Sequence, residues 1–366
     1  MAAPVDLIGH EAVLVHLRAV HAQGHLAHAL LLTGPSGVGK TTLALRLATL
    51  LLDSESWPGG PSAHPDLWLE DGDAESIGVD RVRAGARADA GPSLQDVMGL
   101  RTYAGGMRVA VMARAERLTE PAADALLKTL EEAPPATVIV LCTASPDSLP
   151  ATVLSRVQHV ALAPVPVTAV TAWLESTGVE PRLARLAAGL CGGRPGRGRR
   201  LAEQPGALAS EIEALHAFLA IGGGGLEGAL RAAVELTPGA GAEGRERALL
   251  LLAVWSSFAR DAACEASAAP ELRLWADYEG PLERWAESLG PARLTEILGL
   301  LLRAIGEIAR YAQPRLTFET LLIDIFGGPG SPPPVEVPPL PAGLADAPAA
   351  VARPARPAAR RPARRR

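Results

Sequence analysis

The feature that most constrains this chain is a glycine-rich loop between a run of leucines and an Ala/Leu-rich helical pattern. Residues 34–41 read GPSGVGKT, which satisfies the pattern G-x-x-x-x-G-K-[ST]. The apolar run 30–32 precedes the loop and the helical pattern 43–52 follows it. This is the strand, loop and helix order that the pattern requires. The sequence therefore predicts a phosphate-binding loop.

Each residue type in this loop has a physical role at a phosphate. Gly34, Gly37 and Gly39 allow backbone N–H groups to approach an anion without obstruction by a Cβ atom. Lys40 can reach the β- and γ-phosphates, and the Thr41 hydroxyl can ligate Mg²⁺. A glycine-rich turn without a ligand is the plainer alternative. The loop alone does not decide whether such a site hydrolyses its nucleotide or only holds it.

Composition excludes several classes of protein. The chain has 366 residues, of which 48% are hydrophobic, enough for two or three domains with cores of their own. Its start lacks a signal-peptide pattern and no apolar segment reaches membrane-spanning length, so we expect a cytoplasmic protein without a membrane partner. Cys142, Cys191 and Cys264 are far apart, which argues against a disulfide framework. Five histidines between residues 10 and 28 lack ligand partners at a fixed spacing, and we assign them no metal.

Strands and helices are predicted to alternate through the first half of the chain. The predicted strands are 30–32, 67–69, 108–113 and 137–143, and the predicted helices lie within 7–28, 43–52, 80–87 and 119–132. This alternation predicts a parallel sheet with helices on both faces. The glycine-rich loop would then lie at a carboxyl strand end, where such sheets bind ligands.

Several short motifs follow one another along the chain: LIGH at 7–10, the loop at 34–41, IGVD at 77–80, ALLKTLEEAP at 125–134 and LPATVLSR at 149–156. In order and spacing they resemble the motifs of bacterial DNA polymerase III clamp-loader subunits of the AAA+ family, the delta-prime type first and the gamma/tau type second. The resemblance covers about residues 5–205 strongly and the rest loosely. It implies an AAA+ nucleotide-binding domain followed by a small helical lid and an all-helical collar that holds subunits together.

The resemblance also sets the expected domain boundaries. The AAA+ domain spans 1–163, the lid 164–207, the helical collar 208–326 and a disordered Pro/Ala/Arg-rich tail 327–366. The apolar stripes in 208–326 are also compatible with an ordinary helical core. The arginines of the tail favour salt-sensitive phosphate contacts, and a purely solubilising tail is the alternative.

The segment after the third predicted strand departs from an active ATPase. In an active AAA+ subunit this strand is followed by Asp-Glu, which holds Mg²⁺ and orients the attacking water, whereas this chain has Ala113 and Arg114. Glu116 lies two residues further on, outside the metal position in the family's register. We therefore expect no hydrolysis by this site. ATP or ADP binding stays open, with Mg²⁺ held weakly if at all.

The resemblance assigns the main functional role to Arg156. In the family, the arginine of this Ser-Arg segment enters the nucleotide site of a neighbouring subunit as an arginine finger. Val157 replaces the family's cysteine and leaves the charge intact. A plain surface arginine is the alternative. Thr143 stands where the family carries a polar γ-phosphate sensor, although threonine is also an ordinary strand residue.

Two further departures concern zinc and the lid. Relatives usually insert a four-cysteine zinc module after the loop helix, but residues 51–65 contain no cysteine, so we expect no zinc. The nucleotide-sensing lid arginine of active subunits aligns near Gly196. Arg194 and Arg197 are neighbouring candidates for that role, and a basic loop touching DNA phosphates is the alternative.

Together these features predict a clamp-loader subunit of the delta-prime type that acts by scaffolding and by an arginine finger in trans. Its expected partners are gamma/tau-type and delta-type subunits, the sliding clamp and primed DNA. Two alternatives stay open: an active gamma/tau-like AAA+ ATPase and a stand-alone nucleotide-binding regulatory module. Ala113 and Arg114 oppose the first, and assembly into a clamp-loader complex would exclude the second.

Overall fold

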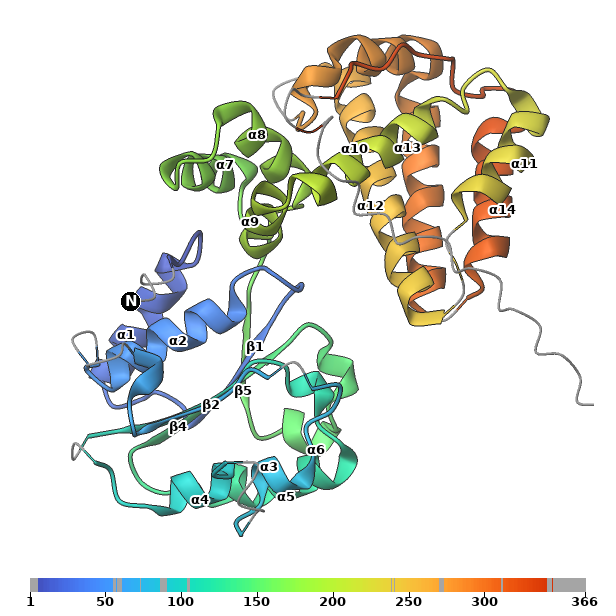
Figure 1. The fold of residues 1–366 in the computed structure, drawn as a ribbon. Helices are drawn as coiled ribbons and strands as arrows, with labels where there is room; N and C mark the ends of the chain where they lie inside the picture. Colours follow the sequence, from blue (N-terminus) through green and yellow to red (C-terminus); the bar gives the residue numbers. More distant parts are fainter. Residues whose placement is uncertain are drawn as a thin grey trace, which may run out of the picture. The chain divides into compact units, whose positions relative to one another are not determined.

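The computed structural model describes residues 6–340 and 344, apart from 55–56, 58–60, 73, 86–90, 104–105, 238, 240, 270–272 and 311. The chain folds into two compact units (Figure 1). The N-terminal unit comprises Met1–Ala184 and Cys191–Arg199, and the C-terminal unit comprises Arg185–Leu190 and Arg200–Arg366.

The N-terminal unit is built on a parallel five-stranded sheet. Its strands are β1 (Ala29–Thr33), β2 (Leu67–Glu70), β3 (Arg108–Met112), β4 (Thr137–Thr143) and β5 (Gln158–Ala161). The strand order is β2-β3-β4-β1-β5, and every neighbouring pair is parallel. The strands β3 and β4 are buried along their whole length, as expected for a parallel sheet that is covered on both faces.

Helices cover both faces of this sheet (Figure 1). The elements are α1 (Glu11–Ala22), α2 (Lys40–Leu51), α3 (Val79–Val82), α4 (Leu94–Gly99), α5 (Glu120–Glu131) and α6 (Ala151–Leu154), with 3-10 turns at Pro61–Ala63, Ala115–Arg117 and Pro146–Ser148. Leu30 and Leu32 of β1 pack with Leu43 of α2, whereas Leu31 packs with Leu126 of α5. Successive strand residues point to opposite faces, so both layers are needed to bury them. The predicted α/β fold, a parallel sheet with helices on both faces, is confirmed.

Three helices follow the sheet. They are α7 (Val167–Ser176), α8 (Pro181–Leu190) and α9 (Pro195–Glu203). The helix α7 belongs to the N-terminal unit, while α8 and α9 each contribute residues to both units. The proposed lid boundaries, like the other domain boundaries, stay a prediction.

The regular secondary structure in the described residues of the C-terminal unit is helical, without strands. Its helices are α10 (Pro205–Leu219), α11 (Gly225–Leu236), α12 (Gly241–Ala266), α13 (Glu279–Ala309) and α14 (Pro314–Phe326), with a 3-10 turn at Ala276–Tyr278. A buried aromatic cluster joins α10, α12 and α14, in which the rings of Phe218 and Trp255 stack at 4.6 Å and Phe318 lies 5.4 Å from Trp255. Within the described part of the chain, none of the helices is both long enough and apolar enough to cross a membrane.

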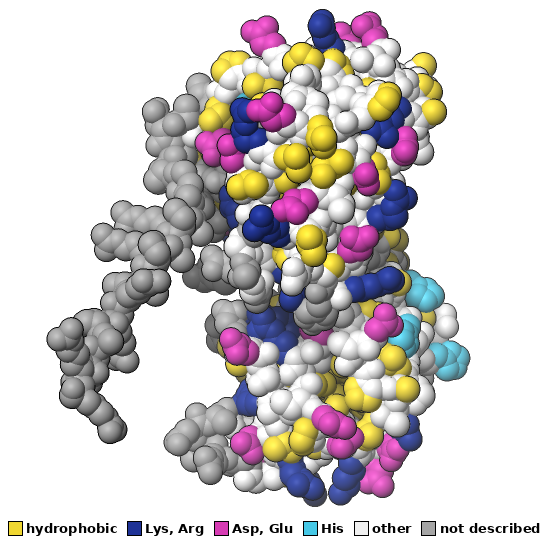
Figure 2. All heavy atoms as spheres, turned by 90° about the vertical axis from the view of Figure 1, so that its right-hand side faces the viewer, with side chains coloured by type: hydrophobic (Ala, Val, Ile, Leu, Met, Phe, Trp, Pro, Cys, Tyr) yellow, Lys and Arg dark blue, Asp and Glu magenta, His cyan; other side chains and the backbone are white. Residues whose placement is uncertain are grey.

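The surface of the C-terminal unit carries exposed apolar side chains. Figure 2 shows hydrophobic side chains distributed among charged ones over one face of this unit. Leu226, Leu230 and Val234 of α11 are 51%, 46% and 68% exposed. Their spacing of four residues places them on one side of the helix.

The described part of the predicted tail lacks helices and strands but has contacts. The Gly223 N–H donates to the carbonyl oxygen of Pro332 at 3.3 Å. The Ser331 hydroxyl donates to the carbonyl oxygen of Phe326 at 2.9 Å. The predicted disorder of residues 345–366 and the arginines among them lie outside the described residues.

Candidate functional site

The glycine-rich loop joins β1 to α2 at the carboxyl edge of the sheet. Gly34, Gly37 and Gly39 have φ angles of 142°, 81° and 113°, in the region that favours glycine. A Cβ atom at Gly34 would lie 2.5 Å from the carbonyl oxygen of Leu162. Lys40 and Thr41 form the first turn of α2. The loop therefore has backbone conformations that glycine adopts readily, as a phosphate-binding loop requires.

Lys40 folds back over this loop. Its Nζ atom donates to the carbonyl oxygens of Gly34 at 2.7 Å and Pro35 at 3.0 Å. Burial lowers the pKa of Lys40, while Cys142 and Glu116 act in the opposite direction. Since burial raises the pKa of Cys142 to about 12, this thiol is neutral, and Glu116 supplies the negative charge near Lys40. A bound phosphate would compete with the two carbonyl oxygens for the Lys40 ammonium.

Thr143 lies at the same edge of the sheet. It ends β4 opposite Thr33, the residue that precedes the loop. The Thr143 side chain is fully buried and its Oγ1 accepts a hydrogen bond from the Ser145 N–H at 3.0 Å. The hydroxyl keeps its own proton as a donor. The structure thus places Thr143 beside Thr33, and its role as a phosphate sensor stays a prediction.

The end of β3 offers a poor site for Mg²⁺. Ala113 and Arg114 follow this strand, and Arg114 Nη2 donates to the carbonyl oxygen of Asp71 at 3.0 Å. Glu116 Oε2 is buried and accepts no hydrogen bond from the described residues. No group of three or more His, Cys, Asp or Glu within the described ranges is placed to hold a metal ion. At the end of β3 the charged groups therefore include the Arg114 guanidinium and the Glu116 carboxylate.

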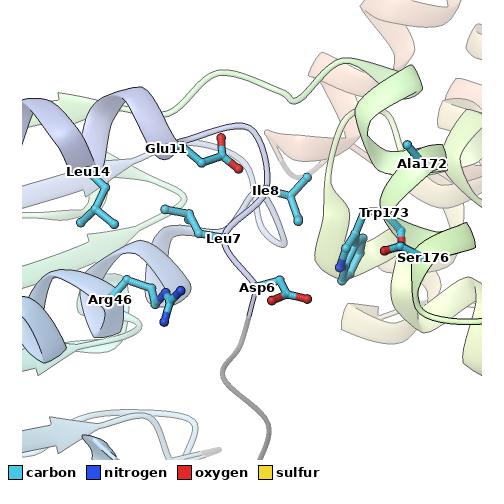
Figure 3. A pocket seen from close by; sticks show the side chains of 9 residues that line it. All are labelled: Asp6, Leu7, Ile8, Glu11, Leu14, Arg46, Ala172, Trp173 and Ser176. Atoms are coloured by element: carbon cyan, nitrogen blue, oxygen red, sulfur yellow. The ribbon is translucent and has the colours of Figure 1, made fainter. Parts of the chain in front are cut away.

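Two features near the loop were missed by the sequence analysis. The His10 Nε2 atom lies 3.1 Å from the carbonyl oxygen of Val38, so the residue before α1 contacts the loop directly. A cavity of about 530 Å³ is lined by residues of the segment before α1 and by residues of α1, α2 and α7. Figure 3 shows Asp6 and Ile8 on one side of this cavity and Trp173 and Ser176 on the other. Nothing in the spacing of these residues along the sequence indicated a shared cavity.

The start of α9 contacts the loop through the backbone. The Gly196 N–H donates to the carbonyl oxygen of Gly37 at 2.9 Å. A Cβ atom at Gly196 would lie 3.2 Å from that oxygen. Arg194 Nε donates to the carbonyl oxygen of Cys191 at 2.9 Å, and Arg197 is 9% exposed. Near the position where the resemblance places the lid arginine, this chain therefore has a close contact between Gly37 and Gly196.

Arg156 lies at the opposite edge of the sheet from the loop. It precedes β5, which runs parallel to β1 with Gln158 paired to Leu30 and Ala161 paired to Thr33. Arg156 is therefore at the amino edge, and the loop after Thr33 is at the carboxyl edge. The four residues of β5 separate the two edges by about 13 Å. The structure does not bring Arg156 together with the loop of its own chain.

Comparisons with known proteins agree with the motifs. Residues 9–166 match the family model described as DNA polymerase III, delta subunit. The delta-prime subunit of Escherichia coli K12 is 33% identical over 198 residues, which cover 49% of this chain and 56% of the relative. This part of the chain resembles DNA polymerase III subunits. The resemblance inferred from the motifs is confirmed.

Other relatives match over similar ranges. The delta-prime subunit of Bacillus subtilis 168 is 31% identical over 179 residues, covering 45% of this chain and 51% of the relative. The tau subunit of Escherichia coli K12 is 32% identical over 154 residues, covering 41% of this chain and 24% of the relative. The chain thus spans about half the length of these delta-prime relatives and about a quarter of the tau subunit.

Two solved structures are also similar. A DNA polymerase III gamma subunit-related protein from Thermotoga maritima is 17% identical with a TM-score of 0.38, covering 85% of this chain and 97% of that chain. The RuvB Holliday junction branch migration motor of Thermotoga maritima is 20% identical with a TM-score of 0.38, covering 56% of this chain and 64% of that chain.

Proposed function

We propose that this chain is a delta-prime-type subunit of a bacterial clamp loader. The subunit binds nucleotide without hydrolysing it, and its Arg156 acts as an arginine finger in the nucleotide site of a neighbouring ATPase subunit. The observation that carries the proposal is the separation of its two functional groups. The loop of residues 34–41 lies at the carboxyl edge of the sheet and Arg156 at the amino edge. A guanidinium at the amino edge serves a nucleotide held by another subunit.

The residues of the loop support nucleotide binding. The backbone N–H groups around Gly37 and Gly39 and the ammonium of Lys40 would hold the phosphates of ATP or ADP. Thr143 would donate its hydroxyl proton to the terminal phosphate. A magnesium ion bound with the nucleotide would neutralise phosphate charge, and the Thr41 hydroxyl would be its ligand from this chain.

The end of β3 supports the absence of hydrolysis. Hydrolysis needs a group that orients the attacking water, and Ala113 cannot accept the proton of a water molecule. The Arg114 guanidinium cannot act as a base and is held by Asp71. The tau subunit is about as similar to this chain as the delta-prime subunits are, but these two residues favour the delta-prime role.

Arg156 would act on the charge that develops during phosphoryl transfer. An arginine guanidinium is positively charged and presents a planar fork of donors to phosphate oxygens. Arginine fingers of this kind accelerate phosphoryl transfer by about 10³ to 10⁵ in isolated GTPases. In a ring with several ATPase sites, loss of one finger removes the turnover of one site and slows the coordinated cycle.

The remaining parts of the chain would serve assembly. The C-terminal unit would be the collar, and the exposed stripe Leu226, Leu230 and Val234 on α11 supports a role for this unit in subunit contact. The proposed partners are gamma/tau-type and delta-type subunits, the sliding clamp and primed DNA, in the cytoplasm. The proposed boundaries are those predicted from the sequence, with the AAA+ domain at 1–163, the lid at 164–207 and the collar at 208–326.

Substitution of Arg156 tests the proposal. In a clamp-loader complex reconstituted with full-length chain, Arg156→Ala is expected to lower steady-state ATP turnover, with clamp and DNA, by about tenfold or more. Lys40→Ala should change turnover little, because this site does not hydrolyse. Arg18→Ala is the matched control, since Arg18 is an exposed arginine on α1.

Four results would contradict the proposal. Hydrolysis of ATP by the isolated chain, or loss of turnover in Lys40→Ala, would show an active gamma/tau-like ATPase. Failure of the purified chain to join gamma/tau-type and delta-type subunits would favour a stand-alone regulatory module. Equal turnover for Arg156→Ala and Arg18→Ala would exclude the finger.

Nucleotide affinity is expected to fall at alkaline pH because of Lys40. Burial lowers the pKa of this ammonium, so it loses its proton at a lower pH than a solvent-exposed lysine does. The protonated form binds phosphate, so the affinity for a fluorescent ADP analogue should decrease as pH rises from about 7 to about 10. Lys40→Arg keeps its charge and should bind more weakly but without this pH dependence. A flat profile for the wild type would show that Lys40 is not the phosphate ligand.

A further inference from the structure

Arg156 is held by four contacts within its own chain. Its Nε donates to Glu131 Oε1 at 2.8 Å, and its Nη2 lies 2.5 Å from the same oxygen. On the other side, Nη1 donates to the carbonyl oxygen of Thr152 at 2.9 Å and to Ser155 Oγ at 3.2 Å. A guanidinium has five N–H donors. Both sides of the guanidinium are therefore engaged within the subunit.

The position of Glu131 is fixed by the fold. Glu131 is the last residue of α5, and the carbonyl oxygen of the preceding residue, Leu130, lies 2.8 Å from His28 Nε2. The helix therefore ends at a defined place near the amino edge of the sheet, where Arg156 lies. The carboxylate faces the Nε and Nη2 side of the guanidinium, which is one of the sides that can bind two oxygens of a phosphate.

We propose that the Glu131 carboxylate holds the Arg156 guanidinium within its own subunit while the finger is inactive. When the finger acts, the guanidinium leaves this carboxylate and binds the phosphate of a nucleotide held by a neighbouring subunit. The inference rests on the proposed function of Arg156 as a finger. It adds a restraining partner, which the sequence motifs did not indicate.

The exposure of the pair makes this exchange feasible. The side chains of Arg156 and Glu131 are 37% and 51% exposed, so water and salt screen their attraction. A nucleotide phosphate carries more negative charge and more acceptor oxygens than one carboxylate. The Glu131 carboxylate thus binds the guanidinium when no phosphate is near. The phosphate replaces it when a neighbouring site closes on its nucleotide.

The chain provides a matched control in the next residue. Glu132 follows Glu131, caps the C-terminal end of α5 and is also exposed. Among the described contacts of Arg156, the carboxylate partner is Glu131. Glu131→Gln and Glu132→Gln remove the same charge from neighbouring positions, so a comparison of the two separates the specific contact from a general change in charge.

The first test is ATP turnover of the reconstituted complex without clamp and DNA. Glu131→Gln is expected to raise this basal turnover by about two- to fivefold, the range that an exposed ion pair allows. It should also weaken the salt dependence of basal turnover, because added salt releases the wild-type pair. Glu132→Gln should match the wild type in both respects. The double variant Glu131→Gln with Arg156→Ala should behave like Arg156→Ala alone.

Unchanged or reduced basal turnover in Glu131→Gln would overturn the inference, since reduced turnover would show that Glu131 aligns the finger instead of restraining it. The proposed function fails separately, if Arg156→Ala itself leaves turnover unchanged.

A second measurement needs no complex. In the isolated full chain, NMR should show slower exchange of the Arg156 Nε proton in the wild type and in Glu132→Gln than in Glu131→Gln. Equal exchange rates in all three would also overturn it.

Discussion

Gly34→Ala is expected to abolish nucleotide binding and to lower the free energy of unfolding by about 2–4 kcal/mol. Gly34 has a φ of 142°, which residues with a Cβ atom rarely adopt. The added methyl group would lie 2.5 Å from the carbonyl oxygen of Leu162, so β1 and the segment after β5 would have to separate. Binding of a fluorescent ADP analogue and urea unfolding of the full chain measure the two effects.

Gly24→Ala separates backbone strain from this clash. Gly24 has a positive φ of 74°, but a Cβ atom there would meet nothing within 4 Å. Only the conformational cost of about 1 kcal/mol is expected, with nucleotide binding intact. Normal nucleotide affinity in Gly34→Ala would contradict the assignment of this loop as the phosphate site. Equal destabilisation by the two substitutions would show that the contact with Leu162 relaxes easily.

Much of the N-terminal unit could be predicted because its signals are local. The strands β3 and β4 are continuous apolar runs, and α5 has a proline in its first turn. The strand β5 was missed because its sequence, QHVA, is mostly exposed and forms a strand through its pairing with β1. The helix α4 was also missed, although Ser93 and Asp96 form a capping box that the sequence displays.

The candidate site also combines residues that a local motif identifies with contacts that the sequence does not reveal. Residues 34–41 are adjacent in the chain, so one local motif identifies them. The contacts that complete the site join distant segments: His10 with Val38, Gly37 with Gly196 and Glu131 with Arg156. These contacts depend on how the helices pack against the sheet, and no spacing in a single sequence records that packing. The arginine itself could be found from its motif, but its restraint by Glu131 could not.

In the C-terminal unit, Trp255→Ala is expected to lower the free energy of unfolding of that unit by about 3–5 kcal/mol. The Trp255 side chain is fully buried, stacks on Phe218 and contacts Phe318. Its Nε1 donates to the carbonyl oxygen of Ala214 at 2.9 Å. Removal of the ring would leave a cavity among α10, α12 and α14 and would remove one hydrogen bond to the Ala214 carbonyl oxygen. Differential scanning calorimetry of the full chain measures the loss.

Nucleotide binding should survive this substitution, because every residue assigned to the phosphate site lies in the N-terminal unit. Trp255→Phe is the control: it keeps an aromatic ring, loses the hydrogen bond to Ala214 and should cost about 1–2 kcal/mol. If the C-terminal unit is the collar, Trp255→Ala should also prevent entry into the reconstituted complex at temperatures where the isolated chain still binds ADP. Simultaneous loss of ADP binding and of the C-terminal unit would show that the two units fold as one. Normal assembly after the C-terminal unit has unfolded would contradict its role as the collar.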